Sequence, residues 1–289
     1  MSDAALRPGK GRYTAYWLLA PGAIWLALFF VVPFYSLVSA SLFDPDGSVL
    51  TGYKVTYHFA NYSHAIQDYY PELLRALWYA GLATAICLVI GYVLAYAIAF
   101  KAGKWRNLLL VLVIAPFFTS FLLRTLSWKL ILSDHGFVVS TLQNLHVLGS
   151  DGRLLNTWFA VVAGIVYNFL PFMVLPLYAS LEKIDGRLIE AASDLYANPF
   201  KAFFKVTWPL SLPGVVAGTL LTFIPAAGDF INAQLLGGPG QAMVGNKIQN
   251  LFTTTGDYAA AGALSMILMV LIIAMVLVYI RRAGTEDLV

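Results

Sequence analysis

The sequence predicts an all-α protein that crosses a membrane six times. Of the 289 residues, 60% are hydrophobic and only 11% are charged, whereas a soluble domain is nearer a quarter charged. The apolar residues also gather in six runs, each long enough to cross a hydrocarbon core, which takes about 20 helical residues. The expected spans are 17–40, 74–100, 108–132, 157–180, 212–235 and 258–280.

The first run, 17–40, is too long for the apolar region of a signal peptide, and we expect it to be a retained membrane helix. No polar linker separates the six runs, so we expect a single transmembrane domain, 1–289. The loop 41–73 is long and rich in tyrosine. It either lies on the membrane surface or forms a cap.

The positive charges predict the orientation, because Lys and Arg concentrate in cytoplasmic loops. With both termini in the cytoplasm, the outer loops hold only Lys54, Arg153 and Lys247. The inner segments hold twelve basic residues, namely Arg7, Lys10, Arg12, Lys101, Lys104, Arg106, Lys183, Arg187, Lys201, Lys205, Arg281 and Arg282. Twelve against three predicts an even number of spans with both termini inside.

The inner loop 181–211 is patterned for two short helices. Asp185 is a predicted N-cap of the first, whose apolar residues recur at helical spacing. Asn198 is a predicted N-cap of the second, which begins with a proline and is rich in phenylalanine. Pro209 and Pro213 are expected to end this second helix. The pair of helices either lies on lipid headgroups or forms a docking surface for a cytoplasmic protein.

Glu190, Ala191 and Ala192, with a small residue at Ala197 and a closing proline at Pro209 or Pro213, resemble the EAA loop of the permease subunits of ABC importers that work with a substrate-binding protein. Further segments are similar to the first permease of spermidine/putrescine uptake systems: LLAPGAIWLALFFVVPF, LLRTLSW, LSDHGF, LPFMVLPLYASLEKIDGRLIEAASDL, FIPAAGDFINAQLLGGPG and VGNKIQ.

The resemblance implies the type I importer fold, in a bacterial inner membrane. It implies a heterodimer with a second permease, a cytoplasmic ATPase dimer and an external substrate-binding protein. Membrane lipid is a further implied partner of this chain, and nucleic acid is not. The residues implied to couple to the ATPase are Glu190, Ala191, Ala192, Asp194, Leu195, Tyr196 and Ala197. This chain is not expected to be an enzyme and needs no cofactor, because Pro8 to Gly11 lacks the pattern of a phosphate-binding loop; ATP is expected on the partner.

Tyr196 is a departure from the family, which usually has glycine four residues after the second alanine of the motif. Glycine permits a left-handed turn at little cost. Either Tyr196 adopts that conformation under strain, or Ala197 and Asn198 make the turn differently.

Charges within the membrane are functional candidates. Asp229 lies near the outer end of the fifth run beside Pro225 and Gly228, where we expect a bent or broken helix. A carboxylate beside freed carbonyls suits a protonated amine. The alternatives are a structural ion pair with Arg124, expected at similar depth, or a gate.

Three further residues are candidates for the translocation path. Trp128, one helical turn from Arg124, either contacts the cargo or anchors the helix at the membrane boundary. Tyr167 and Asn168 either contact the cargo or serve helix packing.

Other functions remain as alternatives. The same architecture can import another small solute, such as an opine, an iron complex or thiamine. A self-sufficient secondary transporter would show an inverted repeat and usually more spans. A metal site is not expected, since Cys87 is the sole cysteine and all four histidines fall in outer loops.

Overall fold

The computed structural model describes residues 12–47, 51–149 and 152–283, and these residues contain no β-strand. An isolated antiparallel bridge joins Phe43 to Val55. Five helices are long and apolar enough to cross a membrane, and a sharply bent pair brings the number to six if it is one span. The all-α prediction is confirmed. Arg7 and Lys10, which the charge distribution assigns to the cytoplasm, lie outside the described residues.

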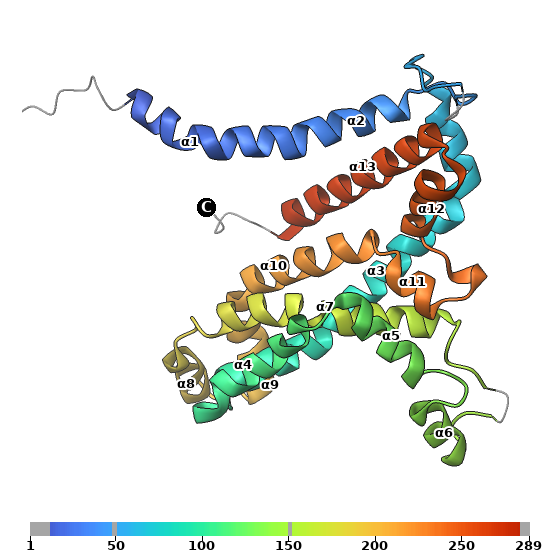
Figure 1. Ribbon diagram of the computed structural model, residues 1–289. Coiled ribbons are helices and arrows are strands. Elements are labelled where there is room, and N and C mark those ends of the chain that lie inside the picture. Colours follow the sequence, from blue (N-terminus) through green and yellow to red (C-terminus); the bar gives the residue numbers. More distant parts are fainter. Residues whose placement is uncertain (1–11, 48–50, 150–151, 284–289) are drawn as a thin grey trace, which may run out of the picture.

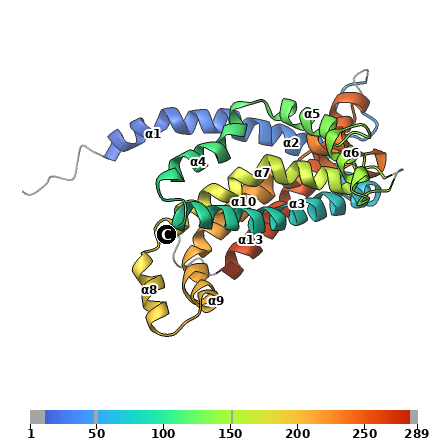
Figure 2. The same ribbon diagram turned by 90° about the horizontal axis from the view of Figure 1, so that it is seen from below.

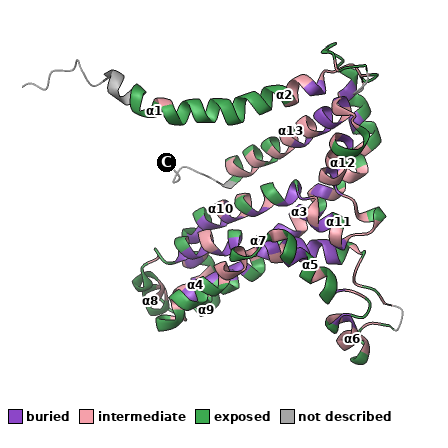
Figure 3. Cartoon of the chain, in the orientation of Figure 1, coloured by how far each residue is buried: buried purple, intermediate pink, exposed green. Residues whose placement is uncertain are grey.

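The N-terminal helix stands apart from the others (Figure 1). It consists of α1 (Arg12–Leu26), a π-helical segment (Ala27–Val31) and α2 (Val32–Ser41). Its apolar window is only 6% buried, and Figure 3 shows it exposed along almost its whole length. It contacts the remaining helices near its C-terminal end, where α2 packs on α13. The expected helix at 17–40 is confirmed.

Helix α3 (Ala60–Phe100) has 41 residues and is longer than the expected span 74–100. The first third of α3, residues 60–73, therefore lies in the loop predicted at 41–73. Hydropathy detected only the most apolar part of the helix. The preceding turns carry polar residues such as Asn61 and Asp68 that lower the hydropathy without ending the helix.

The third predicted span, 108–132, is not one straight helix. It comprises α4 (Arg106–Ile114), a 3₁₀ turn (Ala115–Phe118) and α5 (Phe121–Ile131). The two arms meet at 93°. Thr119 and Ser120 have extended ψ angles of 153° and 136° between them, which ends the first arm. The short helix α6 (Phe137–Asn144) follows.

Helix α7 (Trp158–Leu181) lies at the centre of the bundle and fits the expected span 157–180 (Figure 2). Thr157 caps it by accepting a hydrogen bond from the Ala160 N–H at 3.3 Å. The helix packs along α10 (Trp208–Ala227) with little space between the backbones. A Cβ added at Gly214 would lie 2.7 Å from the Pro176 carbonyl oxygen, and one added at Gly218 would lie 2.8 Å from the Met173 sulfur.

The prediction that Pro209 and Pro213 end a helix is wrong. α9 (Pro199–Ala202), a π-helical segment (Phe203–Thr207) and α10 form one continuous helix through both prolines. Each proline removes only one backbone donor, and α7 packs against this region, so the helix tolerates them. The fifth span therefore begins earlier than the predicted 212–235.

The fifth span breaks after Ala227, as predicted near Asp229, and resumes as α11 (Ile231–Leu236). α12 (Val244–Asn250) then runs through a π-helical segment (Leu251–Thr255) toward α13 (Tyr258–Ala283). α13 matches the expected sixth span, 258–280, and contacts α2 and α3.

Candidate functional site: the helix breaks and the coupling surface

Two short helices project from one end of the bundle (Figure 2). The first, α8 (Gly186–Asp194), begins as predicted, because the Asp185 carboxylate accepts a hydrogen bond from the Arg187 N–H at 3.0 Å. The second, α9, begins as predicted at Asn198, whose side-chain oxygen accepts from the Lys201 N–H at 2.8 Å. Both predicted caps are confirmed.

The turn between these helices is left-handed at Tyr196, with φ of 60°. The Ala197 N–H donates to the Ala192 carbonyl at 3.0 Å, and the Tyr196 N–H donates to the Ser193 carbonyl at 2.9 Å. These two bonds form a Schellman motif with Tyr196 at the position where glycine is usual. Of the two alternatives for the turn, the chain adopts the strained one.

The residues predicted to couple to the ATPase form one exposed surface at this end of the molecule, here called the coupling surface. Leu195 is 82% exposed and Tyr196 is 98% exposed. Glu190, Ala191 and Asp194 are also exposed, while Ala192 and Ala197 are partly buried. An apolar side chain this exposed at the end of a rigid turn suits a protein partner.

Aromatic side chains pack the base of the coupling surface against the helix bundle. The Phe203 ring lies 5.4 Å from that of Tyr92, and the Tyr92 hydroxyl is hydrogen-bonded to that of Ser211 at 2.7 Å. Arg106 and Glu182 form an exposed ion pair at 2.8 Å nearby. The short helices are therefore attached firmly to α3 and α10 at their base.

The break in the fifth span holds Asp229 inside the protein, with 7% of its surface exposed. One carboxylate oxygen accepts from the Asn232 backbone N–H at 2.9 Å, and the other accepts from the Asn232 side-chain amide at 3.1 Å. Asp229 therefore caps the first turn of α11. Its carboxylate keeps further acceptor capacity, because an ionised carboxylate has about four lone-pair sites.

Asn232 connects this carboxylate to two other helices. Its side-chain oxygen accepts from the Asn168 amide of α7 at 3.0 Å. The same Asn168 amide donates to the Thr125 hydroxyl of α5 at 3.2 Å. Thr125, Asn168, Asp229 and Asn232 are all buried, and they are called the buried network below.

Asn232 and Thr125 were not singled out from the sequence. Asn232 lies three residues after Asp229, which is the spacing of a helix cap, and this was the available signal. Its contact with α7 is close because Gly164 leaves room: a Cβ there would lie 2.8 Å from the Asn232 side-chain oxygen.

The structure does not bring Arg124 and Asp229 together as an ion pair. Among the described residues, the ion pairs within 4.0 Å are those of Arg106, Arg153 and Lys247. Arg124 is 8% exposed and stacks near the rings of Phe117 and Phe121 instead. The structural ion pair, one of the alternatives that the sequence left open, is therefore not formed. Asp229 caps a helix instead, and Arg124 makes aromatic contacts.

Trp128 of α5 and Tyr167 of α7 are in contact, with ring centroids 5.4 Å apart and ring planes tilted by 58°. They line an apolar pocket of about 470 Å³ together with Leu82, Ile86, Trp158, Phe159, Val162, Ala163, Val166 and Leu170. Of the five candidate path residues, these two share one site, Asn168 and Asp229 share another, and Arg124 belongs to neither.

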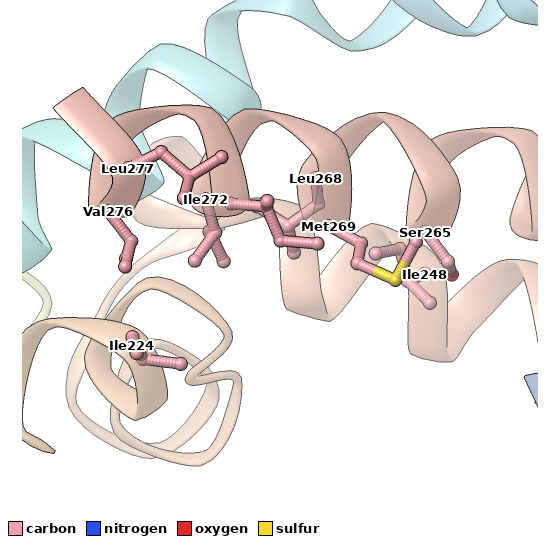
Figure 4. Close-up of a pocket in the computed structure, with 9 residues that line it drawn as sticks. Ile224, Ile248, Ser265, Leu268, Met269, Ile272, Val276 and Leu277 are labelled. Atoms are coloured by element: carbon pink, nitrogen blue, oxygen red, sulfur yellow. The ribbon is translucent and has the colours of Figure 1, made fainter. Parts of the chain in front are cut away.

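A second apolar pocket lies between α10 and α13 (Figure 4). Ile224 of α10 faces Leu268, Ile272 and Val276 of α13 across it. The hydroxyl group of Ser265, which lines this pocket, donates a hydrogen bond to the Ala261 carbonyl at 2.8 Å. This pocket has no group that would bind a charged solute.

The break at Asp229 is also held from the α12 side. A Cβ added at Gly245 would lie 2.8 Å from the Gly228 carbonyl oxygen. The Asn246 side-chain amide donates to the Phe230 carbonyl at 2.7 Å. α3 contacts the segment that precedes α12, because Arg75 donates a hydrogen bond to the Ala242 carbonyl at 2.6 Å.

The described residues contain no group of three or more His, Cys, Asp or Glu placed to hold a metal ion.

Residues 87–283 match the family described as binding-protein-dependent transport system inner membrane component. The chain belongs to this family. It is therefore an inner-membrane component of a transport system, in agreement with its apolar helices and with the resemblance of its coupling surface.

Individual relatives narrow the similarity to particular members of the family. The chain is 40% identical over 258 residues to the spermidine/putrescine transport system permease protein PotB of Haemophilus influenzae, covering 89% of this chain and 90% of the relative. It is 38% identical to PotB of Escherichia coli K12 over 260 residues, covering 90% and 94%. The inner membrane ABC transporter permease protein YdcU of Escherichia coli is 30% identical over 75% of this chain and 73% of the relative.

A solved bacterial ABC transporter that imports alginate shares the fold. The alignment has a TM-score of 0.74 at 17% sequence identity and covers 96% of this chain and 97% of the other. At that identity the likeness concerns the fold alone. The chain thus has the permease fold of ABC importers.

Proposed function

We propose that this chain is one of two permease subunits of an ATP-driven importer of spermidine and putrescine. The observation that carries the proposal is the identity of 38–40% with permeases named for these polyamines, across about nine-tenths of both chains. Similarity along the whole chain favours a shared cargo more than similarity confined to the coupling surface would.

Six spans with both termini in the cytoplasm fit the helices. The bent pair of α4 and α5 counts as one span in this arrangement. The coupling surface and the Arg106–Glu182 ion pair then share the cytoplasmic side with Lys101 and Lys104, in accord with the preference of basic residues for that side.

Three kinds of partner complete the proposed importer: a second permease, a cytoplasmic ATPase dimer and an external substrate-binding protein. One solved relative in fold is an alginate transporter in complex with a periplasmic protein that holds an alginate pentasaccharide. The coupling surface is proposed to dock in the ATPase, which supplies the hydrolysis for which this chain has no phosphate-binding loop.

The buried network is proposed to contact the cargo on its path. Asp229 offers a carboxylate to a protonated amine, and the helix break beside it leaves backbone carbonyls that accept from the same group. Trp128 and Tyr167 offer aromatic faces to the methylene chain or to a second ammonium group. A gate at Asp229 remains the alternative role.

Coupling is proposed to run through α7 and α10, which leave the coupling surface on either side. The two helices meet again at the buried network, where Asn168 of α7 contacts Asn232 just beyond α10. Movement of the short helices when the ATPase dimer closes would then shift α7 and α10 together and change the surroundings of Asp229.

The proposed cargo is tested by uptake of labelled spermidine and putrescine in a bacterial strain without its own polyamine importer. Expression of this chain with its three partners should restore uptake, and excess unlabelled polyamine should compete. Uptake of thiamine or of an opine with no polyamine uptake would instead establish the alternative cargo. Uptake that persists without the ATPase would contradict an ATP-driven importer.

The docking role of the coupling surface is tested by Glu190→Lys, which reverses an exposed charge at its centre. Co-purification of the ATPase should fall. Arg187→Glu, on the same helix, is the control for a charge change at its N-terminal end. Normal recovery of the ATPase with Glu190→Lys would count against the coupling surface as the docking site.

A further inference from the structure

Arg124 is a buried cation without a counter-charge. It lies in the first turn and a half of α5, beyond the 93° bend, and only 8% of its surface is exposed. Its Nε and Nη1 atoms are buried and have no hydrogen-bond partner. Among the described residues, no carboxylate lies within 4.0 Å of it.

The guanidinium group points back toward the start of α5. Its central carbon lies 5.2 Å from the ring centre of Phe117, which precedes the helix, and 5.7 Å from that of Phe121, its first residue. Helical side chains lean toward the N-terminus. The charge therefore lies at the positive end of the helix dipole, where cations are disfavoured.

The start of α5 has donors of its own that no helical carbonyl accepts. The first helical hydrogen bond runs from the Arg124 N–H to the Ser120 carbonyl at 3.1 Å, so the N–H groups of Phe121, Leu122 and Leu123 precede the ladder. The Ser120 side chain does not cap them. A free helix start and an unpaired guanidinium together have the chemistry of an anion site.

The anion is not available from this chain's own break. Asp229 forms no ion pair with Arg124 within 4.0 Å, and its carboxylate is hydrogen-bonded to Asn232 instead. The hydroxyl of Thr125, the neighbour of Arg124, belongs to the buried network. In the six-span arrangement proposed above, the bend lies between the two apolar arms of one span, α4 and α5, so lipid phosphates are not expected to reach it.

We propose that Arg124 and the start of α5 receive a carboxylate side chain from the second permease subunit. The inference rests on the proposed function in one respect, that the pore contains a second permease. Arg is suited to this role, since its planar group binds a carboxylate through two parallel hydrogen bonds and keeps its charge when buried. The contact would fix the register of the two subunits at the bend.

The test is charge reversal in the whole transporter, with a tag on this chain. Arg124→Glu should lower the co-purified second permease by at least about tenfold, because a buried pair would become a buried repulsion. In that background, each Asp and Glu within the spans of the second permease is changed to Arg in turn. One such change should restore co-purification.

Three further variants separate pairing from folding. Lys129→Glu makes the same charge change on an exposed residue of the same helix and should leave assembly unchanged. Arg124→Lys keeps the charge without the planar fork, and it should recover more second permease than Arg124→Gln, which has similar size and no charge.

Three outcomes would overturn the inference: normal assembly with Arg124→Glu, failure of every reversed carboxylate to rescue it, or equal recovery with Arg124→Lys and Arg124→Gln. If the partner of Arg124 is a mobile anion, assembly of the unmodified transporter will depend on chloride and on no carboxylate. That result would also overturn the inference. Assembly is measured without cargo, so a wrong assignment of the polyamine would leave these results intact.

Discussion

Two apolar helical segments are broken within the described residues, and each break holds one buried charge, but the two charges have different surroundings. At the α10–α11 break, both oxygens of Asp229 accept hydrogen bonds from Asn232. At the bend before α5, two nitrogens of Arg124 have no partner at all. Neither charge forms an ion pair among the described residues, but Asp229 has hydrogen-bond partners within this chain, whereas two buried nitrogens of Arg124 have none.

The difference shows that a broken helix does not by itself identify a cargo site. A break that supplies its own donors can hold a carboxylate ready for a cation with little reorganisation. A break that leaves a guanidinium unsatisfied pays a desolvation penalty until something outside the chain relieves it. Proposed roles in transport and in assembly follow from this contrast.

The largest expected effect comes from removing the side chain of Asn232, which donates a hydrogen bond to the Asp229 carboxylate. Asn232→Leu deletes the side-chain donor to Asp229 and the side-chain acceptor of the Asn168 amide, while the backbone N–H donor to Asp229 remains. The loss of these two buried hydrogen bonds should cost about 3 kcal/mol of stability. Thermal unfolding in detergent and polyamine uptake should both show the loss. Gln234→Leu, at an exposed position of α11, is the matched control. Equal stability of the two variants would mean that the buried network does not hold Asp229.

Asp229→Asn should have a large effect on uptake and a small one on stability. Asparagine caps a helix about as well as aspartate, so the break should persist, with a loss of about 1 kcal/mol. A cargo contact would lose its charge, and uptake should fall at least about tenfold. Normal uptake at a normal protein level would exclude the cargo role and leave the cap as the whole function of Asp229.

Gly245→Val should have an intermediate effect, because its side chain would press on the backbone at the Asp229 break. A Cβ there lies 2.8 Å from the Gly228 carbonyl oxygen and 3.1 Å from that of Asp229. Overpacking of this kind costs about 1–3 kcal/mol. Gly240→Val, in the 3₁₀ turn that precedes α12, is the control, because nothing lies within 4 Å of an added Cβ there. If both variants melt alike, the close approach at Gly245 is not needed.

Tyr196→Gly should have the smallest effect and the opposite sign. The backbone at Tyr196 is strained but no charge is buried there, so this variant is a reference for the variants at the two breaks. A left-handed conformation costs a non-glycine residue about 1–2 kcal/mol, and the larger entropy of unfolded glycine offsets part of the gain. Stability should rise by less than about 1 kcal/mol, with ATPase coupling retained. A loss of coupling would show that the tyrosine side chain itself contacts the ATPase.

Local features of the fold were predictable from the sequence, because they depend on neighbours in the chain. Hydropathy located the apolar segments, and side-chain oxygens at Asp185 and Asn198 marked two helix starts. The proline and glycine beside Asp229 predicted a break that the structure contains.

Features that depend on distant contacts were not predictable. Asn168 and Asn232 are 64 residues apart, and no local pattern joins them. The bend at Thr119 and the continuity of the helix through Pro213 depend on neighbouring helices. The sequence placed Arg124 and Asp229 at similar depths, but depth does not specify which way each side chain faces.

The close approach of α7 and α10 limits how this permease can move. Gly214 and Gly218 bring the α10 backbone against Pro176 and Met173 of α7, an interlock of small residues common between membrane helices. Sliding one helix past the other would drive side chains into backbone, so shear between them is blocked. A transport stroke must then swing the two helices together as one arm, with the bending left to the segments at its ends.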